Sequence, residues 1–357
     1  MASATVGLRR LSQQRLTREP LATPVEVVSW LGAVQSQEYQ PAQWSLGMRM
    51  RDASYDAIER AFNEGAILRT HVLRPTWHFV APTDIRWLLE LTAPRVKAAS
   101  AYYARQLELD EATFTRSNDI IASALAGGKS LTRAELGQEL ARAGITAEAQ
   151  RLGHIVMRAE LDAVICSGPR RGKQFTYALL AERAPQAQAL PRDEALAALT
   201  CRYFTSHGPA TERDFAWWSG LTLTDARAGL RMVSADLTRE EIDGQTYWSG
   251  ASALPPADPT HEAFLMPTYD EMLVGYEGFG AALTGGRGNG EWAAFNATIM
   301  CGGQVIGNWR RTITKNAAVI EVAPFAPWSD AGREAILAAA GRYGAFFGVS
   351  VECVGLS

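Results

Sequence analysis

The chain contains little lysine and cysteine and no long apolar run, and each shortage excludes a class of protein. Its four cysteines are scattered through 357 residues without a CxxC pair, and no HExxH motif occurs. Neither a structural zinc site nor a disulfide framework is therefore expected. No apolar stretch approaches the roughly 18 residues of a membrane span, and the first residues lack the apolar core of a signal peptide. We expect a soluble, cytoplasmic protein with no membrane partner.

Lysine accounts for only four of the 35 basic residues, so arginine is the dominant cation. Two explanations remain open. One is GC-rich codon usage, and the other is recognition of phosphate, whose oxygens pair with the guanidinium fork. The net charge of −3 argues against a nucleic-acid binder, but the charges are unevenly distributed. Residues 1–18 carry four arginines and no acid, whereas residues 258–279 carry five acids and no lysine or arginine.

Nucleotide-dependent enzymes are disfavoured by the motifs that are missing. The chain has no P-loop, and the glycine-rich stretch from Gly285 to Gly290 lacks the strand-to-helix setting of a dinucleotide fingerprint. We interpret that stretch as a loop. The acidic pair Asp270-Glu271 is interpreted as structural, because an acidic pair in such a segment suits pairing with arginine better than catalysis beside phosphate.

One supersecondary pattern recurs, and its clearest copy spans residues 116–189. Ser130 is expected to cap a helix, and a second helix that starts at Thr146 keeps apolar residues at helical spacing. Two strands follow, joined by a basic turn at residues 168–173. Helix, helix, strand, turn and strand in this order predict a winged helix.

The same order recurs at residues 190–257, where Thr224 is expected to begin the third helix, and more loosely at residues 1–115. The composition shifts after Pro255-Pro256, and residues 258–357 read as an antiparallel β meander with a helix from Asp330 to Phe347. The sequence therefore predicts a helix-rich α+β fold of three tandem winged-helix units followed by a C-terminal α+β region.

Basic residues occupy the outer faces of the predicted helices and the turns between the predicted strands. A winged helix meets DNA through these two places, with the helix in the groove and the wing on the backbone. The alternative is that they are ordinary solvated surface. The expected DNA contacts are Arg69, Arg74, Arg151, His154, Arg158, Arg170, Arg171, Lys173, Arg227 and Arg231, with Arg310, Arg311 and Lys315 as a second phosphate clamp.

Two glutamines stand near the end of a predicted helix that starts at Thr23. Pro41 disfavours helical geometry at the preceding residue, so the helix is expected to end near Gln37. Gln37 then lies at the edge of the apolar stripe and Gln35 on its other flank. Buried carboxamides need several partners, so this pair is unusual. Both a functional role and a purely structural one, solvated or bonded in the interior, remain open.

Five motifs occur in order along the chain: Gln35-Ser36-Gln37, Arg69 to His78, Tyr203 to Gly220, Leu265 to Gly275 and Val305 to Arg311. Together they resemble the AlkZ-like family, the winged-helix DNA glycosylases related to the azinomycin-resistance enzyme. The resemblance implies three winged helices in a C-shaped body around DNA, with His78 among the DNA contacts. It also implies a catalytic Gln-aliphatic-Gln motif at Gln35 and Gln37, with Ser36 in the aliphatic position.

The implied reaction is hydrolysis of the N-glycosidic bond of alkylated purines in DNA repair, with interstrand crosslinks as a further candidate substrate. A cationic purine is already a good leaving group, so no general acid, metal or cofactor is expected. Gln37 would orient the water and Gln35 would assist, their carboxamide oxygens facing the developing oxocarbenium. We expect a monomer that binds double-stranded DNA at the nucleoid. The alternatives are a non-catalytic winged-helix regulator and a protein-interaction module.

Overall fold

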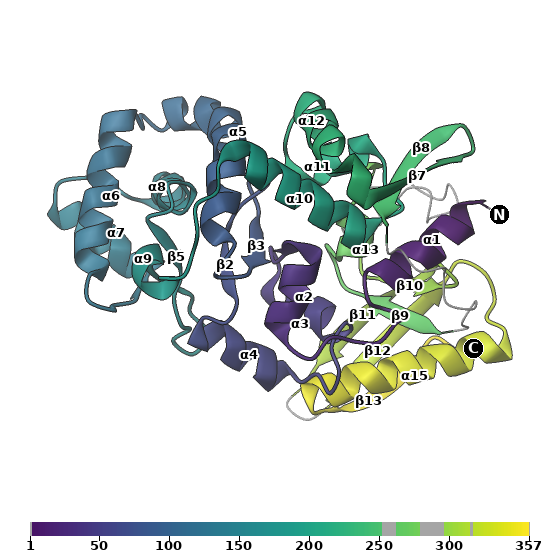
Figure 1. Cartoon of the computed structure of the whole chain (residues 1–357). Coiled ribbons are helices and arrows are strands. Elements are labelled where there is room, and N and C mark those ends of the chain that lie inside the picture. Colours follow the sequence, from purple (N-terminus) through teal and green to yellow (C-terminus); the bar gives the residue numbers. More distant parts are fainter. Residues whose placement is uncertain (1, 252–261, 279–295, 315–316, 357) are drawn as a thin grey trace. The chain divides into compact units, whose positions relative to one another are not determined.

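The protein is a mixture of helices and sheets, and it divides into two compact units (Figure 1). The structure, a computed structural model, describes residues 2–251, 262–278, 296–314 and 317–356. The first unit comprises Met1–Glu59, Ala197–Trp218 and Thr222–Ser357, and the second comprises Arg60–Leu196 and Ser219–Leu221. About 50% of the chain is helical and 21% is strand, which confirms the predicted mixed, helix-rich class.

Several predicted features lie outside the described residues. They are the glycine-rich stretch from Gly285 to Gly290, the boundary at Pro255-Pro256, and Lys315 of the predicted second phosphate clamp. Within the described part of the chain, no helix combines the length and apolar character needed to cross a bilayer.

The first unit holds the N-terminal helices and all of the C-terminal sheet. Its elements are α1 (Ala2–Gln13), α2 (Pro24–Leu31), β1 (Val34–Gln35), α3 (Tyr39–Gly47), α12 (Leu223–Val233), the 3-10 turn Ser234–Asp236, β7 (Leu237–Ile242), β8 (Gln245–Gly250), β9 (Ala263–Met266), α13 (Glu271–Val274), β10 (Thr298–Cys301), β11 (Gln304–Ile313), β12 (Ala317–Pro324), α15 (Asp330–Phe347) and β13 (Ser350–Val354). Three helices run across the boundaries of the division: α4 (Tyr55–Glu64), α10 (Arg192–His207) and α11 (Glu212–Ser219).

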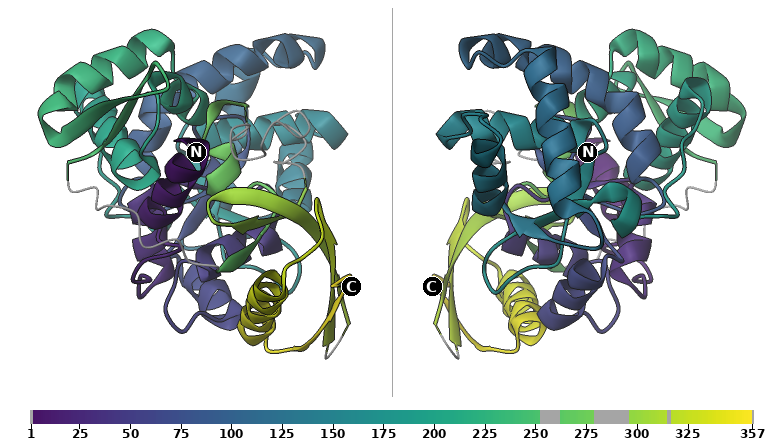
Figure 2. Two further views of the ribbon diagram at one scale, coloured as in Figure 1. Left: turned by 90° about the vertical axis from the view of Figure 1, so that its right-hand side faces the viewer. Right: turned by 90° about the vertical axis from the view of Figure 1, so that its left-hand side faces the viewer.

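The C-terminal sheet has five strands in the order β13-β12-β11-β10-β9. Neighbouring strands are antiparallel except β12 and β13, which pair in parallel, with Ala318 opposite Val351. Helix α15 lies along one face of this sheet (Figure 2). The predicted meander is present, and α15 has the predicted bounds. The strand β9 and the parallel pairing of β13 were not predicted.

Aromatic rings fill the space between the sheet, α15 and α3. The ring of Tyr343 on α15 lies 5.1 Å from that of Trp44 and 5.4 Å from that of Trp309 on β11. The indole N–H groups of Trp44 and Trp309 donate hydrogen bonds to the carbonyl oxygens of Leu265 and Met266, both at 2.8 Å. Each large ring therefore buries its apolar face and satisfies its one donor. These contacts fix the strand that leads to α13.

The α10, α11, α12, β7 and β8 elements follow the order predicted for residues 190–257. Helix α12 begins at Leu223, and Thr222 is its N-cap in a reciprocal capping box with Asp225. The prediction that Thr224 begins this helix was therefore one residue late. Strands β7 and β8 form a hairpin across Asp243-Gly244, a residue pair that favours the tight turn between two such strands.

The second unit repeats this order. Its elements are β2 (Leu68–His71), β3 (Trp77–Val80), α5 (Ile85–Gln106), α6 (Glu111–Leu125), β4 (Leu131–Thr132), α7 (Arg133–Arg142), α8 (Ala149–Leu161), β5 (Ile165–Ser167), β6 (Thr176–Leu179) and α9 (Leu180–Arg183). Strands β4, β6 and β5 form a three-stranded antiparallel sheet in that order. Residues of α6, α7, α8 and this sheet share one hydrophobic core.

The N-cap of α7 is Thr132, and the prediction of Ser130 was wrong. The Thr132 hydroxyl accepts the N–H of Glu135 at 3.3 Å, and the Glu135 carboxylate accepts the N–H of Thr132 at 2.7 Å. Both ends of a capping box are therefore made at Thr132, whereas Ser130 precedes the short strand β4.

Helix α2 ends at Leu31, six residues before Gln37, near which the sequence predicts its end. Gly32 adopts a φ of 86°, a conformation that glycine reaches without strain and that stops the helix. The chain then continues as the strand β1, so Gln35 lies on extended backbone rather than at a helix end.

Candidate active site

The two predicted catalytic glutamines lie in different environments. Gln35, at the end of β1, is 7% exposed, and Ser36 is fully buried. Gln37 is exposed and lies two residues before α3 begins at Tyr39. The Gln-Ser-Gln segment therefore emerges from the interior of the first unit, with one carboxamide held inside and the other at the surface.

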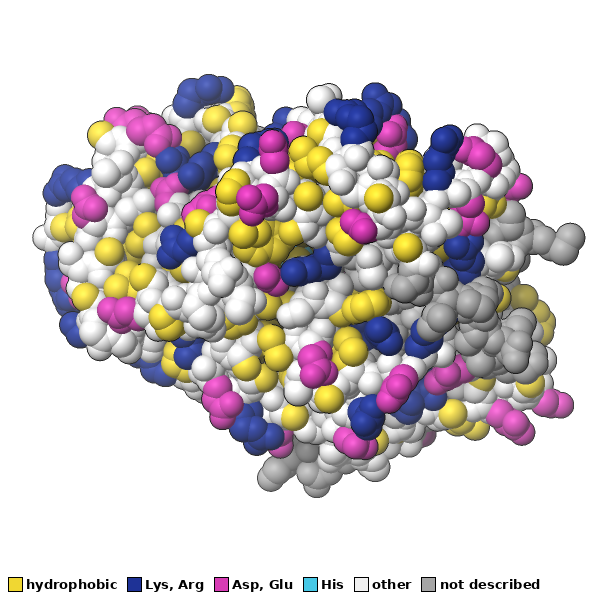
Figure 3. All heavy atoms as spheres, viewed as in Figure 1, with side chains coloured by type: hydrophobic (Ala, Val, Ile, Leu, Met, Phe, Trp, Pro, Cys, Tyr) yellow, Lys and Arg dark blue, Asp and Glu magenta, His cyan; other side chains and the backbone are white. Residues whose placement is uncertain are grey.

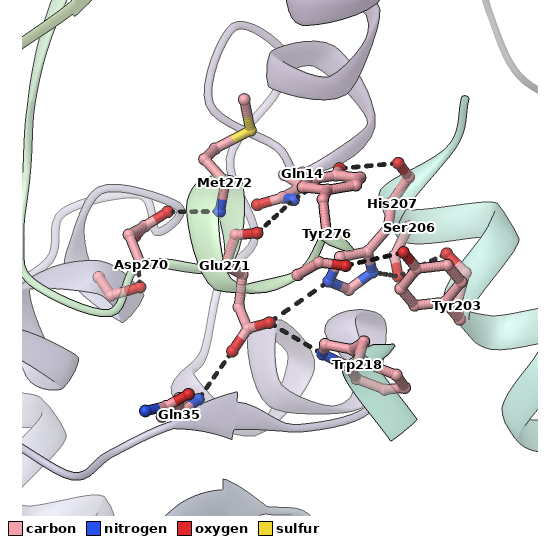
Figure 4. Close-up of polar contacts among 12 residues, drawn as sticks. Gln14, Gln35, Tyr203, Ser206, His207, Trp218, Asp270, Glu271, Met272 and Tyr276 are labelled. Carbon is pink, nitrogen blue, oxygen red and sulfur yellow. Dashed lines mark hydrogen bonds and ion pairs between the residues drawn. The ribbon is translucent and has the colours of Figure 1, made fainter. Parts of the chain in front are cut away.

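The backbone of Gln35 is bound by Glu271, a carboxylate with no exposed surface. The Gln35 N–H donates to Glu271 Oε1 at 2.7 Å, and the indole N–H of Trp218 donates to Oε2 at 3.0 Å. Figure 4 shows the carboxylate between the strand of Gln35 and the ring of Trp218. Both oxygens of this buried carboxylate therefore receive an N–H donor, as a buried acid requires.

His207 is the third group beside Glu271, with Nε2 3.5 Å from Oε2 (Figure 4). Its Nδ1 lies 2.8 Å from the Ser206 hydroxyl oxygen, and its ring stacks on Tyr203 with centroids 4.7 Å apart. Complete burial lowers the pKa of His207, and this effect outweighs the nearby carboxylate. The imidazole is therefore neutral near pH 7.

The neighbouring Asp270 contacts a different set of residues. Its two oxygens accept hydrogen bonds from Nη1 and Nη2 of Arg49, both at 2.9 Å, and neither side chain is exposed. Oδ1 also accepts the N–H of Met272 at 2.9 Å and so caps α13. The prediction that the acidic pair is structural and pairs with arginine is confirmed for Asp270. Glu271 has the separate set of contacts described above.

Close backbone packing holds the other end of α13. A Cβ on Gly275 would lie 2.5 Å from the Glu271 carbonyl oxygen and 2.9 Å from His207 Cδ2, so only glycine fits. The Tyr203 hydroxyl donates to the Gly275 carbonyl at 2.8 Å, and the Gln14 side-chain amide donates to the Glu271 carbonyl at 3.2 Å. The segment that carries Glu271 is thus fixed at both ends. Sequence reasoning missed this role, because no local pattern links positions 236 residues apart.

On the second unit's α8, two of the three predicted DNA contacts are engaged internally. The Arg151 guanidinium donates to the carbonyls of Thr146, Leu107 and Glu108. Arg158 pairs with the carboxylates of Glu111 and Asp162, which raise its pKa. These two arginines stabilise the fold around α8, a use that helical spacing could not distinguish from a DNA-facing position.

His154, the third predicted contact on α8, lines a cleft of about 490 Å³ in the second unit. Its ring lies 6.1 Å from that of Tyr103, and partial burial lowers its pKa. The other walls of this cleft include Trp77, Arg133 and Tyr177.

The turn between β5 and β6 contains three basic residues, which differ in their contacts with the rest of the protein. Arg171 is exposed, yet it donates two hydrogen bonds to the Glu135 carboxylate, both at 2.8 Å. Those bonds, together with the hydrogen bonds that Glu135 accepts from Thr132, lower the pKa of Glu135 to about 2. Arg170 donates to the Lys173 carbonyl at 3.0 Å and lies over the Phe175 ring, whereas the Lys173 side chain is exposed.

The first hairpin contains two buried residues among its three predicted contacts. Arg69 is 8% exposed, and its guanidinium lies 4.4 Å from the Trp77 ring centroid and 4.8 Å from that of Phe175. His78 is fully buried, and its Nδ1 lies 3.0 Å from the Thr76 carbonyl oxygen. Arg74, between β2 and β3, is half-buried. The burial of Arg69 and His78 places both side chains in the interior of this hairpin.

In the first unit, the predicted contacts again separate into paired and exposed residues. Arg227 forms a salt bridge with Glu212 at 2.7 Å, and Arg231 is exposed. Arg310 is exposed opposite Glu321 on the neighbouring strand and lines a cleft of about 590 Å³ with Glu38.

Arg310 and Arg311 both line this cleft, but their side chains have different neighbours. The Arg311 guanidinium lies 5.8 Å from the Tyr343 ring centroid, on the side of the sheet where α15 packs. Successive side chains of a strand point to opposite faces, so Arg310 is directed away from α15. On the face of the molecule shown in Figure 3, basic side chains are interspersed with acidic ones. Among the described residues, no three His, Cys, Asp or Glu side chains come together as a metal site would require.

The fold is that of a known DNA glycosylase. The solved structure of the Streptomyces sahachiroi DNA glycosylase AlkZ matches this chain with a TM-score of 0.79 at 21% identity, covering 98% of this chain and 99% of that one. A relative from the same organism, the interstrand DNA cross-link repair glycosylase, is 27% identical over 284 residues, which are 73% of this chain and 74% of the relative.

The model of the AlkZ-like DNA glycosylase family matches residues 28–346. The chain belongs to this family, and it is a DNA glycosylase that acts in DNA repair. The resemblance inferred from the five sequence motifs is thereby confirmed. The match includes Gln35, Gln37 and Glu271, the residues at the centre of the candidate site.

Proposed function

We propose that this glycosylase hydrolyses the N-glycosidic bond of cationic, alkylated purines in double-stranded DNA, interstrand crosslinks included, and that it works as a monomer at the nucleoid. The choice of site rests on one observation. The fully buried carboxylate of Glu271 accepts a hydrogen bond from the backbone N–H of Gln35, with an N···O distance of 2.7 Å. The extension to crosslinks is supported by the name of the 27% identical relative.

The chemistry follows from the charge of the lesion. When the bond between C1′ and the purine nitrogen breaks, its electron pair returns to the base and neutralises the cation. The oxocarbenium left at C1′ is attacked by water, whose proton passes to solvent. Gln37 orients this water through its carboxamide oxygen, and Gln35 turns its own oxygen dipole toward the positive charge. A carboxamide is a weak base, so neutral lesions with poor leaving groups react slowly.

We infer that the order α6-β4-α7-α8-β5-β6 and the order α10-α11-α12-β7-β8 each form a winged helix, with a looser third in the N-terminal region. The DNA contacts we assign are the exposed cations Lys173, Arg231 and Arg310, with Arg74 of the first hairpin. Arg171 and Arg227 join them when their acidic partners are displaced. Arg151 and Arg158 support the fold instead, because carbonyl and carboxylate groups already engage them.

The decisive experiment is base excision from duplexes that carry N7-methylguanine, N3-methyladenine or a crosslink mimic. We expect wild type to leave an abasic site without nicking the strand, and Gln35→Ala and Gln37→Ala to slow excision by about 10²–10³-fold. Gln40→Ala is the matched control, an exposed carboxamide on α3. The proposal fails if wild type releases no base from any of these duplexes, or if the Gln35 and Gln37 variants match Gln40→Ala.

The assignment of DNA contacts has its own test. Lys173→Ala should weaken duplex binding and reduce the slope of log K against log salt by about one, because one phosphate contact is lost. Arg158→Ala should instead lower the stability of the protein and leave that salt slope in place. Equal slopes for wild type and Lys173→Ala would remove this turn from the DNA interface.

A further inference from the structure

The two oxygens of Glu271 explain why a carboxylate rather than a carboxamide stands at this position. Oε1 accepts the N–H of Gln35 at 2.7 Å, and Oε2 accepts the indole N–H of Trp218 at 3.0 Å. A carboxylate can accept both donors, whereas a carboxamide accepts one and turns its own NH₂ toward the other. In a site without exposed surface, two donors facing each other are costly.

The carboxylate is itself held in place. Its backbone belongs to α13, which Asp270 caps and which the Gly275 contact with His207 closes at the other end. The Gln14 amide fixes the Glu271 carbonyl at 3.2 Å, and Arg49 fixes Asp270. The position of Glu271 is therefore set by contacts that do not involve the Gln-Ser-Gln segment.

We propose that Glu271 is a positioning residue for the glycosylase reaction, which holds the Gln35 backbone so that its carboxamide is aimed at the reacting nucleoside. This inference rests on the proposed role of Gln35. A short charge-assisted hydrogen bond to a buried carboxylate is stronger than one between neutral groups, and it leaves Gln35 one backbone position. Because the Gln35 side chain is attached to this fixed backbone, fewer orientations are open to it. Less conformational entropy is therefore lost when the lesion binds.

Glu271 has no exposed surface. It therefore acts on the reaction through Gln35 and does not itself touch DNA.

The test is a double-mutant cycle in single-turnover excision of N7-methylguanine, with wild type, Glu271→Gln, Gln35→Ala and the double variant. Glu271→Gln should lower the excision rate at least tenfold while the dissociation constant for lesion DNA stays within twofold. In the Gln35→Ala background, Glu271→Gln should cost less than twofold, because the residue it positions is gone. A merely structural residue would lower the rate by the same factor in both backgrounds.

Trp87→Phe is the matched structural control. It removes a buried indole hydrogen bond to the Asp84 carboxylate at 3.1 Å in the second unit, which contains neither the glutamines nor α13. All variants are compared at a temperature where circular dichroism shows each to be folded. We expect Trp87→Phe to lower the thermal midpoint and keep the excision rate.

The outcomes separate the two proposals. If Gln35→Ala excises as fast as wild type, the catalytic role of Gln35 fails, and the positioning role fails with it. If Gln35→Ala is slow but Glu271→Gln keeps the wild-type rate, or if its cost is equal in both backgrounds, only the positioning role of Glu271 is overturned.

Discussion

The guanidinium of Arg49 and the carboxylate of Asp270 form a two-pronged salt bridge in the interior of the first unit, with both N···O distances at 2.9 Å and neither side chain exposed. Arg49 also donates to the Gln14 backbone carbonyl at 3.0 Å and to the Gln14 side-chain oxygen at 2.8 Å. The pair therefore joins the segments that directly follow α1 and α3 to the start of α13. These elements support the position of Glu271 behind the glutamines.

Removing one partner of this pair should destabilise the protein strongly. Asp270→Asn leaves the Arg49 charge buried, so we expect a loss of about 3–5 kcal/mol in the free energy of unfolding. Urea titration followed by tryptophan fluorescence measures it. Arg51→Met is the matched control: its salt bridge to Glu19 is 2.8 Å long, but the two side chains are 55% and 80% exposed. That change should cost about 0–1 kcal/mol, and similar losses for both variants would contradict the assignment.

The capping box of α7 makes a second prediction about stability. Thr132→Ala removes the hydroxyl that accepts the Glu135 N–H, and we expect it to cost about 1 kcal/mol. Ser130→Ala, two residues earlier, should change the unfolding free energy by less than about 0.5 kcal/mol. Denaturant midpoints of the two variants decide between these cap assignments. A larger effect at Ser130 would restore the prediction made from the sequence.

The salt bridge between Arg171 and Glu135 should restrain DNA binding by the turn between β5 and β6. Because the pKa of Glu135 is about 2, the carboxylate stays ionised at every pH at which the protein is assayed. Glu135→Gln should free Arg171, tighten duplex binding and steepen the salt dependence by about one ion.

Glu139→Gln makes the same change of charge on the same helix and serves as the control, because Glu139 pairs with Arg142 instead. Fluorescence anisotropy at several salt concentrations distinguishes the two variants. Equal tightening in both would assign the effect to net charge and not to Arg171.

His207 should make stability fall at mildly acidic pH. Burial lowers its pKa in the folded protein, so the unfolded chain binds a proton more readily. The stabilising contribution is complete above the unfolded pKa of about 6.5 and is lost as the pH falls below it. One such group contributes a slope of at most about 1.4 kcal/mol per pH unit.

The corresponding variant is His207→Asn, which cannot titrate in this range. Unfolding free energies at pH 5.5, 6.5 and 7.5 should decline less steeply for it than for wild type, whatever its absolute stability. Parallel declines in the two proteins would show that His207 is not the group responsible.

The sequence was most informative where structure is local. The bounds of α15, the hairpin at Asp243-Gly244 and the buried stripe of α8 all follow from patterns within a few residues. The apolar stripe did not indicate the end of α2, because it continues past Gly32, the residue at which the helix stops. The five motifs were specific enough to indicate the family, because all of them occur, in order, along one chain.

The partners of charged side chains could not be predicted. Arg158 and Glu111 are 47 residues apart, and Glu271 and Gln35 are 236 apart. Helical spacing shows which face Arg158 occupies but not which carboxylates of other elements meet it. Adjacency in sequence does not reveal partners either. Arg310 and Arg311 are neighbours in the sequence, yet their side chains are directed to opposite faces of β11.

Asp270 and Glu271 are consecutive residues with different partners, because Asp270 pairs with Arg49 and Glu271 accepts the backbone N–H of Gln35. Their side chains leave the chain in different directions, so the register of the short segment between β9 and α13 decides which acid meets which partner. Deleting a single residue there would move Glu271 to the place of Asp270 and Met272 to the place of Glu271, so that the Gln35 N–H would face a thioether instead of a carboxylate. The length of that segment therefore decides, together with the identity of residue 271, whether Gln35 meets a carboxylate.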